Sequence, residues 1–467
     1  MNQGRDAASV ARILIAASFA SCIVQLDLTV VNVALPRLAE YFSASIAGLQ
    51  WVVDGYTLGF AVLLLSAGAL ADRLGAKRIF VCGFWVLAAT SLAGVFSQTI
   101  WQLNVFRIAQ GIAAALLLPT SLTLLRKSCE GDAKLLARAL GIWAAVGGAS
   151  LAAGPVVGGA LLSAVGWRGV FLINLPICAV GLIVAYRGIP AQLDQAGSRR
   201  LDLKGQWLIV LALTSLIGAA IEYRHLGWRH PLVWGGAGVA MLASCAFVRV
   251  ERRVESPMLP LTLFQDSRFS SPVVFGFLIN VSFSGVLFVL SLYLQKALGY
   301  SAVHAGLAFL PLTATFIFAN LAGGKIAARI GPRMVMIGGG LIAGAGYASL
   351  SWLGQASSVW QMIPGFVLIP AGMGAAVPAM TAILLSGVDS ASAGIASAVL
   401  STARQVGSAL GVAAFGIMVG NGRSADILNA MKPVMLTSAA LLLAAALTAA
   451  MLAPDREDEL ATARTGT

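Results

Sequence analysis

Four long runs without Asp, Glu, Lys or Arg restrict what this chain can fold into. They cover residues 79–106, 139–167, 269–295 and 334–388. About 20 helical residues cross the ~30 Å hydrocarbon core of a bilayer, so each run is long enough for one or two spans. Only 11% of the 467 residues are charged and 58% are hydrophobic, whereas about a quarter of a soluble domain is charged. The sequence therefore predicts an all-α polytopic membrane protein.

Apolar runs of spanning length predict about 14 transmembrane helices. We expect them near residues 11–35, 49–71, 79–97, 102–125, 138–163, 168–187, 203–222, 232–250, 270–292, 304–327, 334–353, 359–385, 393–420 and 434–453. With both termini cytoplasmic, the inner loops and tails hold 22 Lys and Arg residues and the outer loops hold 7, as the positive-inside rule requires. The sequence thus predicts a multi-pass protein of the cell membrane. This bias accounts for the net charge of +12 without a nucleic-acid partner.

A short charged loop between two spans occurs twice. Residues 68–78 contain Gly68, Asp72, Arg73 and Gly75, and residues 324–333 repeat the pattern with Ala328 at the place of Asp72. The copies lie eight spans apart, which predicts two six-helix halves separated by two extra spans, with the binding site between the halves. The expected parts are an N-terminal bundle at 11–190, two linker helices at 200–252, a C-terminal bundle at 260–454 and a cytoplasmic tail at 455–467.

Three charged residues are expected at one depth near the outer face of the first half. Asp27 lies roughly 22 Å along the first span, counted from its cytoplasmic end. Asp54 and Arg107 enter spans 2 and 4 from the outer side. Ionisable residues inside a span are costly and are by default functional. A static buried ion network would explain them, but we favour a proton-coupling site that responds to burial and to the nearby Arg.

Small residues and polar groups mark further positions. Span 5 carries Gly154, Pro155, Gly158 and Gly159, which predicts a kinked helix with a closely packed face. Arg404 lies roughly 15 Å into span 13 and must face the protein interior or water. We assign seven polar residues to a substrate cavity: Asn32, Tyr56, Gln110, Gln295, Asn320, Arg404 and Gln405.

Together these segments resemble the 14-helix drug:proton antiporters (EmrB/QacA type) of the major facilitator superfamily. The resemblance covers residues 11 to about 453 and rests on segments 26–36, 68–78, 107–111, 154–159 and 167–176. It implies proton coupling through Asp27 and Arg107, export by exchange through the 154–159 motif, and a cytoplasmic latch at Asp72. Some multication exporters of that family carry an acid in span 10, where this chain has Asn320 and no acid.

The function expected from these features is proton-driven export of small amphipathic compounds. The alternative is proton-linked uptake of a small metabolite, which the span 5 motif disfavours. A third possibility, an ATP-driven pump subunit or membrane enzyme, lacks a phosphate-binding Gly-x4-Gly-Lys-Ser/Thr loop in this sequence. The five Cys and three His form no metal-like spacing. We therefore expect a monomeric transporter that uses protons and a small molecule, with no metal, no cofactor and no enzymatic activity.

Substrate charge is the last expectation. The intramembrane acids Asp27 and Asp54 both belong to the first half, and the second half has Arg404 near its midplane. Desolvating two positive charges requires carboxylates nearby. The sequence thus favours neutral, weakly acidic or at most monocationic substrates.

Overall fold

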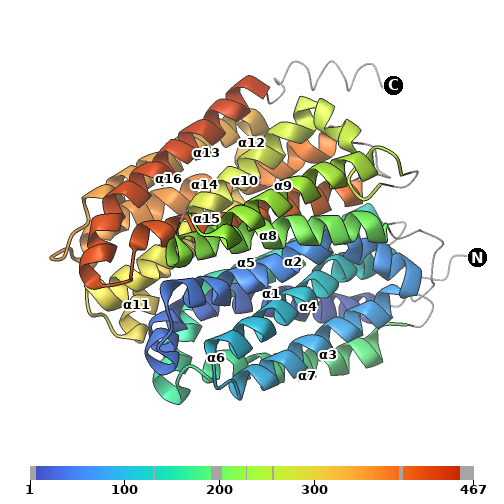
Figure 1. The fold of residues 1–467 in the computed structure, drawn as a ribbon. Helices are drawn as coiled ribbons and strands as arrows, with labels where there is room; N and C mark the ends of the chain where they lie inside the picture. Colours follow the sequence, from blue (N-terminus) through green and yellow to red (C-terminus); the bar gives the residue numbers. More distant parts are fainter. Residues whose placement is uncertain are drawn as a thin grey trace, which may run out of the picture. The chain divides into compact units, whose positions relative to one another are not determined.

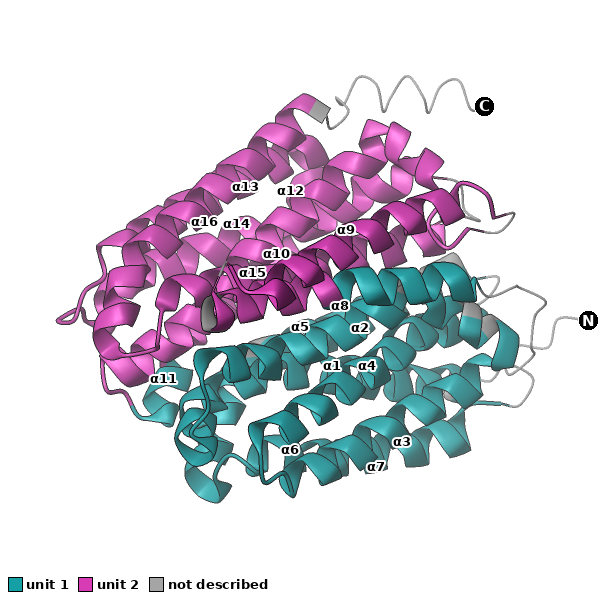
Figure 2. Ribbon diagram, viewed as in Figure 1, with its two compact units in different colours: residues 1–214, 301–307 teal, residues 215–300, 308–467 magenta. Residues whose placement is uncertain are grey.

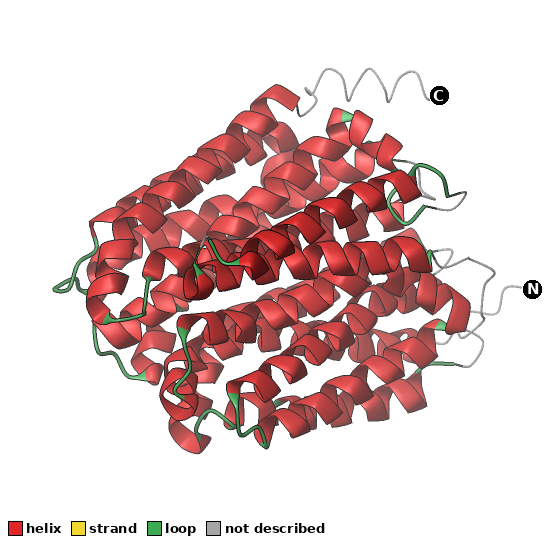
Figure 3. Cartoon of the chain, in the orientation of Figure 1, coloured by secondary structure: helices red, strands yellow, loops and turns green. Residues whose placement is uncertain are grey.

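The computed structural model describes residues 7–129, 132–190, 202–227, 229–254, 257–388 and 393–452. Within these ranges the chain consists of helices and connecting loops without a strand (Figure 3). The helices, labelled in Figure 1, are α1 (Ala7–Phe42), α2 (Ile46–Leu74), α3 (Ala76–Val95), α4 (Ile100–Ser128), α5 (Ala133–Val165), α6 (Gly169–Leu172), α7 (Asn174–Gly188), α8 (Leu203–Leu226), α9 (Pro231–Glu251), α10 (Ser267–Leu292), α11 (Ala302–Ala308), α12 (Leu310–Ile330), α13 (Pro332–Ser349), α14 (Val359–Ser386), α15 (Ala393–Val419) and α16 (Ser424–Leu452). Short turns at Leu261–Gln265, Tyr293–Ala297 and Leu350–Trp352 complete the described elements.

The number of spans agrees with the sequence expectation. In the described part of the chain, 13 helices are long and apolar enough to cross a membrane, and the bent pair Arg138–Leu151 and Ala153–Val165 makes a fourteenth. The expected span at 304–327 is broken between α11 and α12 at Phe309. Pro311 explains the break, because proline has no amide hydrogen to continue the hydrogen-bond pattern of the preceding helix and its ring crowds the carbonyl four residues earlier. The prediction of an all-α polytopic membrane protein is therefore confirmed.

The described helices group into two compact units (Figure 2). Unit 1 comprises residues 1–214 and 301–307, and unit 2 comprises residues 215–300 and 308–467. The division runs through α8, so the expected boundaries of the two bundles and the linker helices stay predictions. The tail at 455–467 lies outside the described residues.

The two units repeat one packing pattern. In unit 1, α1 packs against α4, α5 and α7, while α2 and α3 both pack against α4. In unit 2, α10 packs against α14, α15 and α16, while α12 and α13 both pack against α14. This correspondence is what two parallel six-helix repeats require.

The two copies of the charged loop also share a backbone geometry. Gly75 joins α2 to α3 with φ of 97°, and Gly331 joins α12 to α13 with φ of 90°. Non-glycine residues rarely adopt this conformation, because their Cβ atoms clash with the backbone. The turn geometry therefore explains why both copies of the motif have Gly at this position.

α4 and α14 begin with the same capping arrangement. Thr99 caps α4 and Ser358 caps α14. The side-chain oxygens of Gln102 and Gln361 accept a hydrogen bond from the backbone N–H of the cap residue. Such capping boxes satisfy amide groups that have no partner within the helix. They fix where each helix begins and therefore at which depth its following residues lie.

Candidate functional site: a buried ion pair in unit 1

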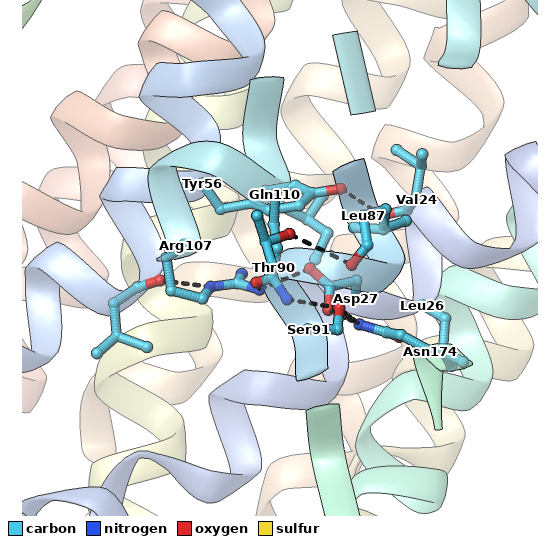
Figure 4. A network of polar contacts seen from close by, with 12 residues as sticks. Val24, Leu26, Asp27, Tyr56, Leu87, Thr90, Ser91, Arg107, Gln110 and Asn174 are labelled. Atoms are coloured by element: carbon cyan, nitrogen blue, oxygen red, sulfur yellow. Dashed lines mark hydrogen bonds and ion pairs between the residues drawn. The ribbon is translucent and has the colours of Figure 1, made fainter. Parts of the chain in front are cut away.

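An ion pair lies in the core of unit 1. Arg107 on α4 donates from Nη1 to Oδ2 of Asp27 on α1 at 2.6 Å, and each side chain is only 1% exposed (Figure 4). Removing two charges from water costs several kcal/mol per ion, so such a pair persists only with good geometry and additional hydrogen bonds. The structure supplies these bonds on both sides of the pair.

Neutral side chains surround the carboxylate of Asp27. Asn174, the first residue of α7, donates from Nδ2 to Asp27 Oδ1 at 2.7 Å and to Ser91 Oγ at 3.1 Å. Gln110 on α4 donates to the same Ser91 oxygen at 2.8 Å. Asp27 is thus bound by groups from α4 and α7, and Ser91 extends the network to α3.

Arg107 has several partners besides the carboxylate. Its Nε donates to the Val52 carbonyl of α2 at 2.9 Å, and its Nη1 donates to Gln110 Oε1 at 2.8 Å. The guanidinium carbon lies 4.6 Å from the ring centre of Tyr56, whose hydroxyl donates to the Val24 carbonyl. A cation over an aromatic face is stabilised by the ring quadrupole. Arg107 would therefore keep a polar environment if Asp27 lost its charge.

Close packing of α2 on α4 places the guanidinium beside the α2 backbone. A Cβ added at Gly59 would come within 3.2 Å of the Ile108 carbonyl carbon, and one at Gly111 within 2.8 Å of the Tyr56 carbonyl carbon. At both positions the carbonyl oxygen would be closer still, at a separation that real Cβ atoms essentially never show, so the two helices could not approach as closely with larger residues. Glycine at these positions is what allows Arg107 to reach Val52.

Small residues likewise join α1 to α5. A Cβ at Gly154 would lie 2.8 Å from Thr29 Cβ, and one at Gly158 would lie 2.7 Å from the Val30 carbonyl oxygen. Thr29 donates to the Leu151 carbonyl at 3.1 Å. On another face of α5, Gly159 lies against the backbone of α11 at Ala302. The 154–159 motif therefore packs against two helical segments, one of them α1, which carries Asp27.

Asp54 stands apart from this network. It is fully buried, and neither carboxyl oxygen has a hydrogen-bond partner in the described part of the chain. The depth estimate places Asp54, Asp27 and Arg107 in one layer, but the structure brings only Asp27 and Arg107 together. The structure therefore does not join all three charges in one ion network.

Comparison with known proteins assigns the family. The model of the Major Facilitator Superfamily matches residues 17–412. The chain belongs to the Major Facilitator Superfamily. It is a multi-pass member of this transporter family, whose proteins handle small-molecule substrates.

Related proteins of this superfamily carry names of resistance and export. The chain is 37% identical to a methylenomycin A resistance protein of Streptomyces coelicolor, over 84% of this chain and 82% of the relative. It is 34% identical to the tetracenomycin C resistance and export protein of Streptomyces glaucescens, over 87% of this chain and 75% of the relative. It is 32% identical to the multidrug efflux pump LfrA of Mycolicibacterium smegmatis, over 84% of this chain and 78% of the relative.

Solved structures support the same fold. An inward-facing, unoccupied bacterial homologue of the human lysosomal transporter Spinster aligns with a TM-score of 0.67 at 18% identity, over 96% of this chain and 97% of that one. A mutant of the nucleoside transporter NupG aligns with a TM-score of 0.66 at 12% identity, over 95% and 99% of the two chains.

The remaining sequence-derived site residues fall into different environments. Tyr56 and Gln110, assigned to the cavity wall from sequence, are fully enclosed and belong to the Arg107 network. Asn32 is buried and donates to the Leu28 carbonyl of its own helix. A second group lies in unit 2 and is partly exposed: Gln295 in the turn after α10, Asn320 on α12, and Arg404 and Gln405 on α15.

The motif of the first charged loop is described only in part. Gly68 lies on α2 with open space where a Cβ would stand, and Arg73 is exposed at the end of that helix. The side chain of Asp72 lies outside the described part of the structure. Lys77 donates to the Ile189 carbonyl at 2.6 Å, next to the end of α7.

Sequence reasoning missed two members of the network, Ser91 and Asn174. Asn174 belongs to a segment that carries the family resemblance, and its position at the outer end of span 6 matches the expected depth of Asp27. That depth match is the signal that could have identified it. Ser91 gave no such signal, because a lone Ser is inexpensive in a span and needs no explanation there.

Proposed function

We propose that this protein is a proton-coupled exporter of small amphipathic compounds, of the 14-helix drug:proton antiporter type. The names of the relatives, which describe resistance, export and efflux, support this direction of transport. In this proposal the protein is a monomer in the cell membrane with both termini in the cytoplasm. The single observation that carries the coupling mechanism is the buried Asp27–Arg107 ion pair.

The proposed proton acceptor is the carboxylate of Asp27. A proton that binds Oδ2 neutralises the carboxylate and removes its attraction for Arg107. Arg107 then stays bound to the Val52 carbonyl, Gln110 and the Tyr56 ring, so the cation is not left unsolvated. Because both protonation states keep polar partners, the exchange can run repeatedly without a large penalty from an isolated buried charge.

The ion pair transmits this change to helix packing. With the pair intact, Asp27 ties α1 to α4 through Arg107 and to α7 through Asn174. Protonation weakens the first tie, which lets α1 move against α4. The close α1–α5 contact at Gly154 and Gly158 then carries the motion to α5, so α1 and α5 shift together.

Two further residues have roles in this proposal. Asp54 is a second proton-binding candidate because it is a buried acid in the same unit. Asp72 is proposed as a cytoplasmic latch, because a carboxylate near a helix end gains about 0.3–2 kcal/mol from a facing helix N-terminus. Replacing Asp72 by Asn should then slow turnover and raise the accessibility of cytoplasmic-side cysteines.

Transport in everted membrane vesicles tests the proposal. An imposed pH gradient, acid inside, without ATP, should drive accumulation of an exported compound, with methylenomycin A and tetracenomycin C as the first probes. Collapse of the gradient by a protonophore should abolish accumulation. Movement only in the opposite direction would support the alternative, proton-linked uptake. A requirement for ATP with the gradient collapsed would contradict both.

A further inference from the structure

Unit 2 contains a cationic side chain that lies inside a span and has no partner among the residues the structure describes. Arg404 is the twelfth residue of α15, about 16 Å from the start of the helix. Among the described residues it forms no hydrogen bond and no ion pair, and its Nε is buried with no acceptor. The side chain as a whole is partly exposed. Intramembrane cations almost always pair with another group, so an unpaired one requires an explanation.

Arg107 shows how this chain satisfies a guanidinium that has a structural partner. Arg107 uses Nε for a backbone carbonyl and Nη1 for Asp27 and Gln110, and its guanidinium carbon lies 4.6 Å from the centre of the Tyr56 ring. Arg404 has none of these partners. The same residue type therefore has hydrogen-bond partners on Nε and Nη1 in unit 1, and none among the described residues in unit 2.

No described acid of unit 2 lies deep in a span where it could neutralise Arg404. The acids are confined to helix ends: Glu222 near the end of α8, Glu251 at the end of α9, Asp266 before α10 and Asp426 in the first turn of α16. Within the described part of this unit, Arg404 is thus a charged side chain deep in a span, with no acidic side chain at a similar depth.

Packing holds the stem of Arg404 in place. A Cβ at Gly276 of α10 would lie 3.3 Å from Arg404 Cγ and 3.0 Å from Met380 Sδ of α14. The stem therefore lies against α10, close to α14, and the absence of a side chain at Gly276 provides the space for it. A guanidinium fixed in this way offers donors in a planar fork, which matches the geometry of a carboxylate or a phosphate.

We propose that Arg404 binds the carboxylate of the exported compound, so that the substrates of this protein include amphipathic organic anions. This inference rests on the proposed exporter function. The substrate anion would supply the counter-charge that the described residues of unit 2 do not. An anionic substrate would also bind without competing for Asp27, whose charge is already matched by Arg107.

Matched probes separate charge recognition from general transport. Fusidate, a carboxylate, is compared with its uncharged methyl ester and with the cation tetraphenylphosphonium in the pH-gradient vesicle assay. For the wild-type protein we expect accumulation of fusidate. Arg404→Gln should lower fusidate accumulation at low concentration about tenfold, the effect of losing one charge-assisted contact of about 1.4 kcal/mol, while ester transport changes less than about twofold. Arg404→Lys should restore part of the loss because it returns the charge without the fork.

Arg423→Gln serves as the matched control, because it removes an exposed cation of the same unit outside the helices. It should leave the accumulation of all three probes unchanged.

Equal loss of fusidate and ester accumulation in Arg404→Gln would overturn the inference and make Arg404 a structural residue. Transport of ester or cation with no fusidate transport by the wild type would also overturn it, while leaving the exporter function intact. Failure of the wild type to move any compound under a pH gradient, including the antibiotics above, would instead refute the exporter function itself.

Discussion

Units 1 and 2 share one helix-packing pattern but place different chemistry in equivalent positions. The eighth residue of α4 is Arg107, bound to Asp27, whereas the eighth residue of α14 is Phe366, stacked on Phe309 with ring centres 5.8 Å apart. The sixteenth residue of α3 is Ser91 in the polar network, whereas the sixteenth of α13 is Tyr347, whose hydroxyl contacts the sulfur of Met373.

This difference helps to distinguish the features that the fold requires from those that serve transport. Both units pack their helices through glycines, and unit 1 has a buried ion pair where unit 2 has the stacked Phe366. A buried pair often contributes no more stability than an apolar replacement of similar volume, and the apolar core of unit 2 is such a replacement within the same molecule. The ion pair is therefore not needed for this architecture, which supports a functional reason for its presence.

The largest expected effect is on coupling in unit 1. Asp27→Asn should reduce pH-gradient-driven transport to background, because the amide cannot take up a proton. It also mimics the neutral, protonated state, in which Arg107 keeps the Val52 carbonyl, Gln110 and the Tyr56 ring, so the loss of stability should stay below the ~3–5 kcal/mol typical of breaking a buried ion pair. Vesicle transport and thermal unfolding of the purified protein measure the two effects. Full transport activity in this variant would move the coupling role to Asp54.

Removing both charges tests whether the ion pair is structurally dispensable, as unit 2 implies. The double variant Asp27→Asn, Arg107→Gln should recover most of the stability lost in Asp27→Asn, because no buried charge remains unpaired. Transport should stay absent. A double variant less stable than the Asp27→Asn single variant would mean that the pair supports the fold itself.

Glycine-to-alanine changes compare the helix contacts of the two units. A Cβ at Gly111 would lie 2.9 Å from the Phe60 amide nitrogen and still closer to Tyr56, whereas one at Gly374 would meet Ala319 Cβ and the Phe316 carbonyl at 3.0 Å. Overpacking costs about 1–3 kcal/mol. Gly111→Ala should therefore be destabilised toward the upper end of this range and Gly374→Ala toward the lower end, as measured by thermal unfolding. The reverse order would contradict the packing argument.

Phe366→Leu examines the apolar counterpart of Arg107. It removes the stacked contact with Phe309 but keeps most of the buried volume, so stability should fall by about 1 kcal/mol. Transport driven by a pH gradient should be retained, in contrast with any change of Arg107. Loss of transport at normal stability would show that unit 2 also takes part in coupling.

The smallest expected effect on stability belongs to Asp54→Asn. No hydrogen bond to a described residue is lost, so the change should cost less than the ~1 kcal/mol of an ordinary hydrogen bond. Its transport phenotype then reports on proton coupling without a folding defect. Wild-type transport in this variant would remove Asp54 from the coupling mechanism.

Much of the fold could be predicted because the bilayer imposes a length on every span. The positions of the helices follow from apolar runs, and the repeat follows from the two charged loops. The break before α12 was not predicted, although Pro311 marks it, because hydropathy continues unchanged across Phe309.

The site could be predicted only as far as charge and depth allow. Counting residues placed Asp27 and Arg107 in one layer, but depth carries no information about which face of a helix a residue occupies. Asp54 and Tyr56 are two positions apart on α2, about 200° around the helix, so the two face different ways. Tyr56 lies against Arg107, and Asp54 therefore could not occupy the same place. Neutral partners such as Ser91 and Asn174 are common in spans, and their identification required the structure.

One contact of α8 bears on how the chain could be shortened. Gln206 donates to the Val62 carbonyl of α2 at 2.8 Å and is also hydrogen-bonded to Ser66. A primary amide is expensive in hydrocarbon, so this side chain anchors the first half of α8 to α2 and specifies its orientation. Excision of the two extra helices to make a twelve-span transporter would remove the Gln206 contacts with Ser66 and with the Val62 carbonyl. The pair of helices is therefore not a neutral insertion, because its removal would leave the Val62–Ser66 segment of α2 without a polar contact that it has in the full chain.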